Sequence, residues 1–308
     1  MSQPTPSTSP AVRPFPSRAR GSAVSVLGIG LTAALFAAAV PASLPAAARK
    51  PQHQPLATSI PASPAKLSDH EIEELATLKP QQQAERLLER AVNHYAGALE
   101  LIDRYIESWY GQLDLQGRLS GSLNTAMNSN DLRVRGAALD IYLAGYSLSK
   151  RSETAETLIR QIQDEPASRP WALFMLGALG NRGIETYRAF TTLMDYRHDP
   201  NEQTRFWAIE GLAALGIDET LAPLLDTFRT DPSPAIRERG ACSLAQSGML
   251  TREQRLRAVP ELLRMMDDPT LDATTRTWVF QALRDITGTG IGPDPATWRN
   301  WWSQHGQS

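Results

Sequence analysis

The stretch PLLDTFRTDP, at residues 223–232, decides the fold, because its pattern recurs along the chain. The pattern begins with Thr or Pro. An aliphatic residue follows two positions later, an apolar residue at five, an acid at eight and Pro at nine. The other copies are TLIRQIQDEP at 157–166, TTLMDYRHDP at 191–200 and PELLRMMDDP at 260–269. The acids recur at intervals of 34, 32 and 37 residues. Periods of this length are typical of stacked helix pairs, in which no single unit can bury its apolar face alone.

The apolar residues of each copy fall on one helical face. Leu221, Leu224, Leu225 and Phe228 give an unbroken i, i+3, i+4, i+7 stripe. Each acid-Pro step is expected to open the next helix, and small residues line up in these helices at Ala137, Ala172, Ala208 and Ala241. The sequence therefore predicts an all-α fold, an α-solenoid of about five helix pairs over residues 130–288.

With these features the chain resembles the HEAT-repeat family. The family has a Pro at the start of the second helix and an Asp followed six residues later by Arg. Asp199 with Arg205, and Asp231 with Arg237, match that spacing. The resemblance implies that these pairs stack into a polar ladder between adjacent repeats and stabilise the solenoid without contacting a ligand.

The spacing changes at both ends of the array. Asp268 is followed by Arg276 after eight residues, and Glu165 by Arg169 after four. The family is composed mostly of scaffolds and adaptors, and a minority resembles bilin-lyase modules that handle a chromophore. The resemblance therefore implies binding of a protein partner, with a lyase-like module as the alternative.

Residues 68–129 are predicted to form an N-terminal helical region. Ser68 and Glu71 form a capping box, and Pro80 suits the first turn of a helix. From Leu88 to Leu113, apolar residues keep a three-and-four spacing that predicts one long amphipathic helix of nearly eight turns. Such a helix must pack on something, either the first repeats or a second chain.

Residues 1–48 are predicted to be an export segment. Ala23 to Val40 is apolar and uncharged, Arg13, Arg18 and Arg20 precede it, and the triplet 46–48 is all Ala. A signal peptide cleaved after Ala48 is the favoured interpretation. The alternative is an uncleaved anchor that contacts the membrane only through residues 21–45. Either way the remainder is expected in the periplasm or cell envelope, after a disordered linker at 49–67.

Composition excludes several classes of protein. Without the three arginines of the export segment, 28 basic residues face 33 acidic ones, a net charge of −5 that offers no basic face for nucleic acid. Cys242 is the only cysteine, so disulfides and cysteine-rich zinc sites are excluded. The five histidines are scattered, and no GxSxG or HExxH motif occurs. We therefore expect no catalytic residue, cofactor or metal, and no enzyme activity.

Residues 289–308 are predicted to form a C-terminal capping helix. Asp294 and Pro295 suit its start, and Trp298, Trp301 and Trp302 share one of its faces. Terminal repeats must cover an otherwise open apolar end, and these tryptophans suit that role. The alternative is an aromatic docking site for a partner.

Together these features predict an exported, non-enzymatic scaffold or adaptor that binds a protein or peptide along the solenoid surface. A lyase-like module handling a small ligand and a membrane-anchored envelope assembly factor are the alternatives.

Overall fold

A computed structural model describes residues 65–306 of the chain. The fold described below is that of these residues alone. Within the described residues the structure is helical and has no strand beyond an isolated bridge between Lys66 and Ala96. The all-α prediction is therefore confirmed. The predicted export segment and almost all of the predicted linker lie outside the described residues.

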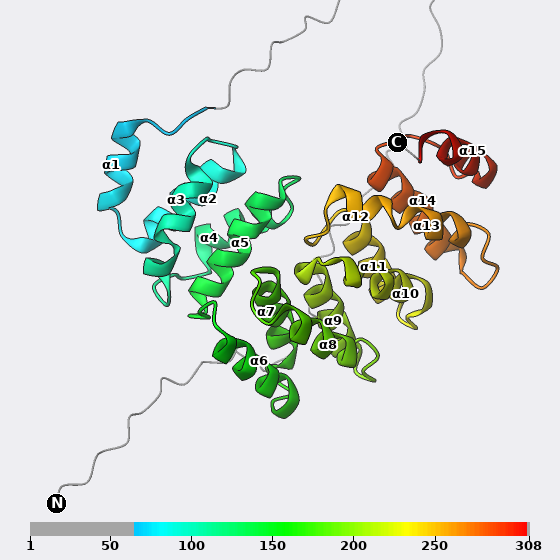
Figure 1. Cartoon of the computed structure of the whole chain (residues 1–308), viewed down its shortest axis with the longest axis horizontal. Helices are drawn as coiled ribbons and strands as arrows, with labels where there is room; N and C mark the ends of the chain where they lie inside the picture. The colour runs from blue at the N-terminus through cyan, green and yellow to red at the C-terminus, as the bar shows by residue number, and fades with distance from the viewer. Residues whose placement is uncertain (1–64, 307–308) are drawn as a thin grey trace, which may run out of the picture. The chain divides into compact units, whose positions relative to one another are not determined.

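The N-terminal helices are α1 (Asp69–Thr77), α2 (Pro80–Val92), α3 (Ala98–Tyr105), the 3-10 turn η1 (Ile106–Trp109), α4 (Gly117–Met127) and α5 (Leu132–Gly145) (Figure 1). The repeat array continues with α6 (Ser152–Asp164), α7 (Arg169–Asn181), α8 (Thr186–Tyr196), α9 (Glu202–Leu215), the 3-10 turn η2 (Asp218–Thr220), α10 (Leu221–Thr230), α11 (Pro234–Ala245), α12 (Arg252–Leu256), α13 (Val259–Met265), α14 (Ala273–Thr287) and α15 (Pro295–His305).

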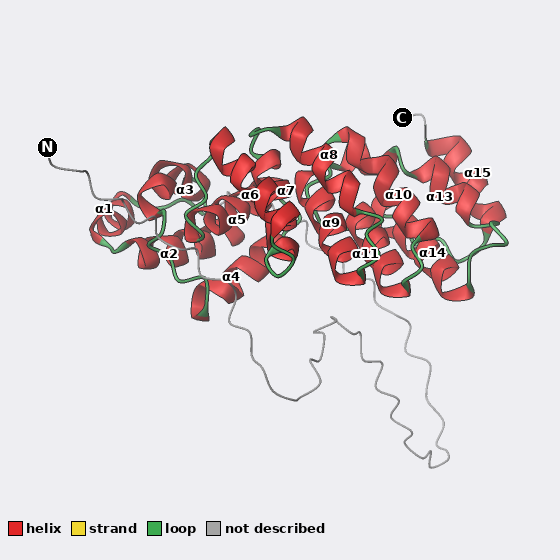
Figure 2. Cartoon of the chain, turned by 90° about the horizontal axis from the view of Figure 1, so that it is seen from below, coloured by secondary structure: helices red, strands yellow, loops and turns green. Residues whose placement is uncertain are grey.

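The repeats form two layers of helices (Figure 2). Helices α7, α9, α11 and α14, called the inner helices below, pack side by side in that order. Each also packs against the helix that precedes it, α6, α8, α10 or α13. Every inner helix begins shortly after one of the acid-Pro steps, as the sequence pattern predicted. The α-solenoid prediction is confirmed.

Two glycines allow the backbones of α7 and α9 to contact each other. A Cβ added to Gly177 would lie 2.1 Å from the carbonyl oxygen of Gly211, and one added to Gly211 would lie 2.6 Å from the carbonyl oxygen of Leu173. Backbone atoms on a neighbouring helix cannot move aside as a side chain can. The two inner helices can therefore pack this closely only with glycine at both positions.

We expect Gly177→Ala to lower the free energy of unfolding by about 1–3 kcal/mol, because the added methyl group must push α9 away from α7. Urea unfolding followed by circular dichroism measures the change. Gly121→Ala is the matched control. Gly121 lies within α4 with nothing within 4 Å of an added Cβ, so its replacement should stabilise the chain by about 0.5–1 kcal/mol. Equal effects at the two sites would contradict close packing as the cause.

The predicted long N-terminal helix is wrong, because the chain breaks between α2 and α3. Asn93 caps the end of α2, and His94 and Gly97 have positive φ angles of 58° and 91°. Ala96 instead exchanges backbone hydrogen bonds with residues 65 and 67, with N···O distances of 2.8 and 3.3 Å. Apolar spacing alone could not reveal the break, because α2 and α3 fold back and bury their stripes in the same core.

Helix α5 joins the N-terminal helices to the repeats. Ala138 and Ile141 are buried in the core formed with α1–α4, whereas Leu139 and Leu143 are buried in the core of the repeats. The helix is thus enclosed on nearly all sides. Of the two partners considered for residues 68–129, the first repeats of the same chain are the one observed.

Candidate functional site

The buried ionic contacts of the array form a ladder between repeats. Arg205 Nε donates to the carboxylate of Asp231, one repeat later, at 3.0 Å. Another guanidinium nitrogen of Arg205 donates to the backbone carbonyl of Asp199 at 2.9 Å, within its own repeat. The Asp199 carboxylate instead accepts from the Asn201 amide at 2.7 Å. Arg205 therefore joins a carbonyl of its own repeat to an acid of the next.

Arg237 repeats this arrangement with an unexpected acid. It donates to the carbonyl of Asp231 at 2.7 Å and to the carboxylate of Asp272 at 2.9 Å. The acid of the sequence pattern, Asp268, instead binds Arg229 at 2.6 Å. The turn from Asp268 to the start of α14 is longer than the turn from Asp231 to the start of α11, and the N-cap residue Asp272 takes the place of the ladder acid.

Asp272 makes this last contact sensitive to pH. Hydrogen bonds from the side chain and amide of Thr275, with the charge of Arg237, hold the pKa of Asp272 at about 2. A carboxyl group whose pKa is lowered by folding stabilises the fold above its unfolded value, near 3.9, and this contribution is lost as the pH falls towards 2. We expect Asp272→Asn to melt below the wild type at pH 6 and the gap to close between pH 4 and 2. A gap of constant size in thermal melts would contradict this.

A cleft of about 440 Å³ lies between the N-terminal helices and the repeats. Its lining includes Glu100 and Asp103 of α3, Asp140 of α5, Arg182 just after α7, and Met249 of the turn after α11. Asp140 is 5% exposed and bonds Arg182 at 3.1 Å and Lys150 at 3.4 Å. The buried charge of the cleft is therefore paired, and its two α3 carboxylates are exposed.

Partly exposed aromatic side chains form a row across three helices that lie side by side, α5, α7 and α9. Tyr142, Phe174 and Trp207 meet edge to face, with ring centroids 6.2 and 6.1 Å apart. Phe206 extends the row beside Trp207, and a second pair, Tyr146 and Trp171, lies on α5 and α7. We call these six residues the aromatic row. Sequence reasoning missed it. The available signal was the presence of Trp and Phe in both α7 and α9, whereas α11 has no aromatic residue.

Next to the row on α9, Glu210 forms a two-point ion pair with Arg239 of α11, with one N···O distance of 3.0 Å. Burial raises the pKa of the Glu210 carboxyl group, and the charge of Arg239 opposes that shift. Burial also raises the pKa of the Cys242 thiol. The neutral thiol is a poor nucleophile, as expected for a cysteine that serves as a small apolar residue.

The three C-terminal tryptophans have different surroundings. Trp298 is fully buried, and its indole N–H donates to the carbonyl of Gly292 at 3.0 Å. Trp301 and Trp302 are partly buried against the same core, and Trp301 stacks on His305 with centroids 4.9 Å apart. Trp298 is thus inaccessible to a partner, because it fills the end of the core. Only the other two tryptophans expose any surface.

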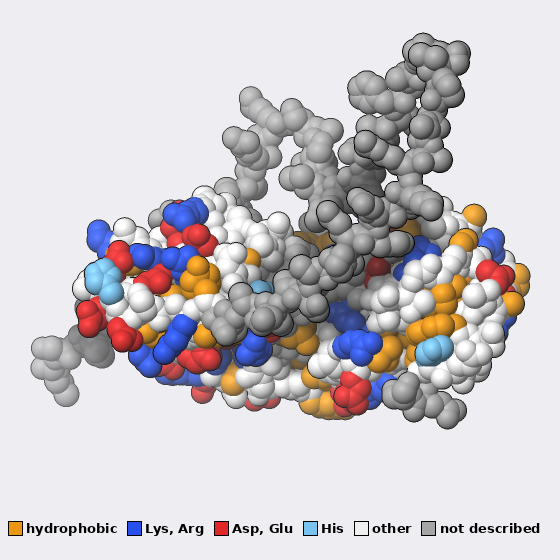
Figure 3. All heavy atoms as spheres, turned by 90° about the horizontal axis from the view of Figure 1, so that it is seen from above, with side chains coloured by type: hydrophobic (Ala, Val, Ile, Leu, Met, Phe, Trp, Pro, Cys, Tyr) orange, Lys and Arg blue, Asp and Glu red, His pale blue; other side chains and the backbone are white. Residues whose placement is uncertain are grey.

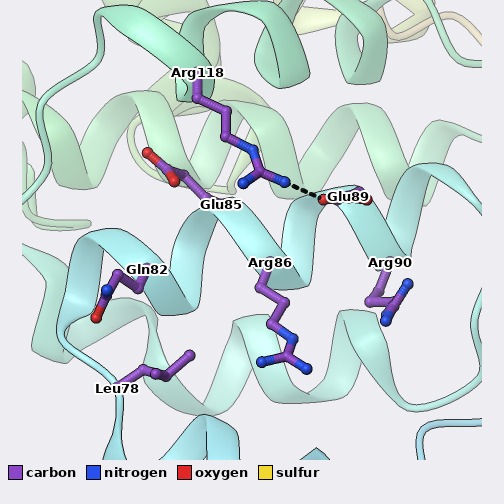
Figure 4. Close-up of a pocket in the computed structure, with 7 residues that line it drawn as sticks. All are labelled: Leu78, Gln82, Glu85, Arg86, Glu89, Arg90 and Arg118. Atoms are coloured by element: carbon purple, nitrogen blue, oxygen red, sulfur yellow. Dashed lines mark hydrogen bonds and ion pairs between the residues drawn. The ribbon is translucent and has the colours of Figure 1, made fainter.

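A groove beside α2 is lined mostly by charged side chains, and Figure 4 marks the ion pair between Arg118 and Glu89 among them. Arg118 of α4 reaches Glu89 at 2.7 Å, and Arg86 and Arg90 reach acids of α1 at 2.8 Å. These pairs fasten α1 and α4 to α2. On the face seen in Figure 3, positive and negative side chains are interspersed in the same way, with apolar side chains between them.

Within residues 65–306 no group of three or more His, Cys, Asp or Glu side chains could hold a metal ion. In the same part of the chain, no helix combines the length and apolar character needed to cross a membrane.

Comparison with known families identifies the repeats. The family of HEAT repeats matches residues 155–245 and again residues 190–284, which together extend from most of α6 through α13 to most of α14. No curated protein matches the chain. HEAT repeats are commonly protein-interaction scaffolds and are typically non-enzymatic. The resemblance seen in the spacing of acids and prolines is thereby confirmed, and residues 155–284 of the chain are HEAT repeats.

Proposed function

We propose that the chain is an exported, non-enzymatic scaffold of the cell envelope that binds a protein or peptide partner along its inner helices. The aromatic row carries this proposal. Tyr, Trp and Phe are enriched at the buried centres of protein interfaces, because they offer large apolar areas with few rotatable bonds. Six such residues gathered on three adjacent helices, each of them partly exposed, suit that role.

The charges of the cleft also favour a macromolecular partner. The cleft beside α5 is open to solvent, and its buried carboxylate, Asp140, is already neutralised by Arg182 and Lys150. A catalytic acid or base needs a proton that it can exchange, and a doubly paired carboxylate is poorly suited to that. A surface of aromatic rings next to paired charges suits recognition more than chemistry.

A site-specific cross-link tests the proposal. Phe206 is replaced by the photoreactive amino acid p-benzoylphenylalanine in cells that produce the full chain. Tyr187, which is 76% exposed on α8, carries the same group in the control. The proposal expects one discrete cross-linked protein from position 206 and none from 187. Equal products at both positions, or none at 206, would refute binding at the row.

Trp207→Ala is expected to lower the yield of the position-206 cross-link at least tenfold. Loss of one central aromatic contact commonly costs about 2 kcal/mol or more, and about 1.4 kcal/mol is already tenfold in affinity. A thermal melt must first show that the variant is folded at the labelling temperature. An unchanged yield from folded Trp207→Ala would place the contact elsewhere.

Export is proposed from the apolar run Ala23 to Val40 and the Ala triplet at 46–48. Cell fractionation followed by sequencing of the native N-terminus tests it. A periplasmic protein beginning at Arg49 is expected. A membrane-bound protein that retains the segment would favour the anchored alternative, and a cytoplasmic protein would refute export.

A further inference from the structure

Arg135 of α5 makes a contact unlike any other in the described part of the chain. Its guanidinium donates to the carbonyls of Gln246 at 2.7 Å and Gly248 at 2.6 Å, in the turn that follows α11. These bonds span 111 and 113 residues, whereas every other side-chain hydrogen bond found within residues 65–306 spans 42 or fewer. Arg135 therefore reaches past α7 and α9 to a repeat that is not its neighbour.

Arg135 also makes the local contact that is typical of the ladder arginines. Arg135 Nε donates to the carbonyl of Ser129, six residues earlier, at 2.5 Å. Arg205 and Arg237 likewise donate to carbonyls six residues earlier. Arg135 thus occupies the ladder position of its own helix pair. Its remaining donors go to the turn after α11 instead of to an acid of the next repeat.

The turn after α11, which accepts these bonds from Arg135, is also held by other parts of the repeats. Arg255, which is 7% exposed, donates to the carbonyls of Ser243, Leu244, Ser247 and Leu250 at 2.6–3.2 Å. The Met249 amide donates to the carbonyl of Ala213 at 2.8 Å. Carbonyls at the end of a helix carry partial negative charge and suit arginine donors. The turn is therefore a fixed anchor for Arg135.

We propose that Arg135 is a cross-brace that fixes the angle between the N-terminal helices and the repeats and so sets the width of the cleft. In a solenoid each repeat contacts only its neighbours, so small changes between neighbours add up and the stack can bend. A bond that skips two inner helices prevents this accumulation. Met249 of the anchored turn and Leu99 and Leu132 of the N-terminal helices line the same cleft, so bending would change its width.

Loss of the brace should leave the helices intact and broaden the distribution of distances between the two parts. Spin labels are placed on cysteines at the exposed positions Glu107 of η1 and Glu253 of α12, in a full chain that carries Cys242→Ser. Pulsed electron resonance measures the distances between them. The wild-type background is expected to give one narrow distribution, and Arg135→Met at least a doubling of its width.

Arg133→Met is the matched control, since this neighbouring arginine is exposed and, within residues 65–306, its side chain bonds only Asp131 at the start of its own helix. The proposal expects the wild-type width for this variant. If circular dichroism shows that Arg135→Met is unfolded, the distances are measured in Arg135→Lys instead. Lysine keeps the charge but cannot serve three carbonyls in a fixed geometry, so it too must broaden the distribution. An unchanged width in the folded Arg135 variant, or equal broadening in Arg133→Met, overturns the proposal.

Discussion

Arg205→Met is expected to lower the free energy of unfolding by about 3–5 kcal/mol, because it removes one partner of a buried ion pair. Arg205 is 8% exposed and Asp231 is 7% exposed. Without the guanidinium, the Asp231 carboxylate keeps only the Ser233 amide, at 2.8 Å. The backbone carbonyl of Asp199 also loses a donor. Urea unfolding followed by circular dichroism measures the loss.

Arg188→Met is the matched control for this prediction. Arg188 bonds Glu156 between adjacent repeats at 3.4 Å, but the side chains are 48% and 55% exposed. Exposed pairs contribute about 0–1 kcal/mol, so this variant should lie within that range. In the double variant Arg205→Met/Asp231→Asn, part of the loss should return, because no unpaired charge stays buried. A cost below about 1 kcal/mol for Arg205→Met would show that water reaches the ladder.

The sequence predicted the positions of the inner helices well, because the signals are local. An acid followed by Pro ends one helix and begins the next within a few residues, as at Asp199 and Asp231. The arginine six residues later follows from the same local geometry, since it returns to the carbonyl of the turn it has just left. The N-cap at Ser68 is local in the same sense, because its side chain accepts from the Glu71 amide. The other half of the predicted capping box is not formed, since the Glu71 carboxylate pairs with Arg90 instead.

What the sequence could not predict depends on residues distant along the chain. The break at Gly97 is stabilised by backbone bonds from Ala96 to residues 65 and 67, some thirty positions earlier. The contact of Arg135 with Gly248 depends on how three intervening helix pairs place that turn. The aromatic row becomes a row only when α5, α7 and α9 lie side by side. Periodicity shows which face of a helix is apolar, and packing decides what that face meets.

Burial, which packing decides, also determines which of the C-terminal tryptophans contributes most to stability. Trp298→Ala is expected to cost about 3–5 kcal/mol, as a large side chain is removed from a fully buried site. The donor to the Gly292 carbonyl and the edge-to-face contact with Trp301, at 6.0 Å, are lost with it. Trp302→Ala is the control. Trp302 is partly exposed, so its replacement should cost about 1 kcal/mol.

Hydrogen exchange shows which helices lose stability in this variant. It therefore distinguishes a residue that caps the last repeat from one that stabilises the whole fold. Because each repeat is stabilised by its neighbours, removal of the cap should loosen α13 and α14 first and spread inward. In Trp298→Ala, amides of these helices should exchange faster by at least tenfold, while amides of α2 and α4 keep their protection. Uniform acceleration along residues 65–306 would instead mean that the fold opens as one cooperative unit. In that case the role of Trp298 would extend beyond closing the last repeat.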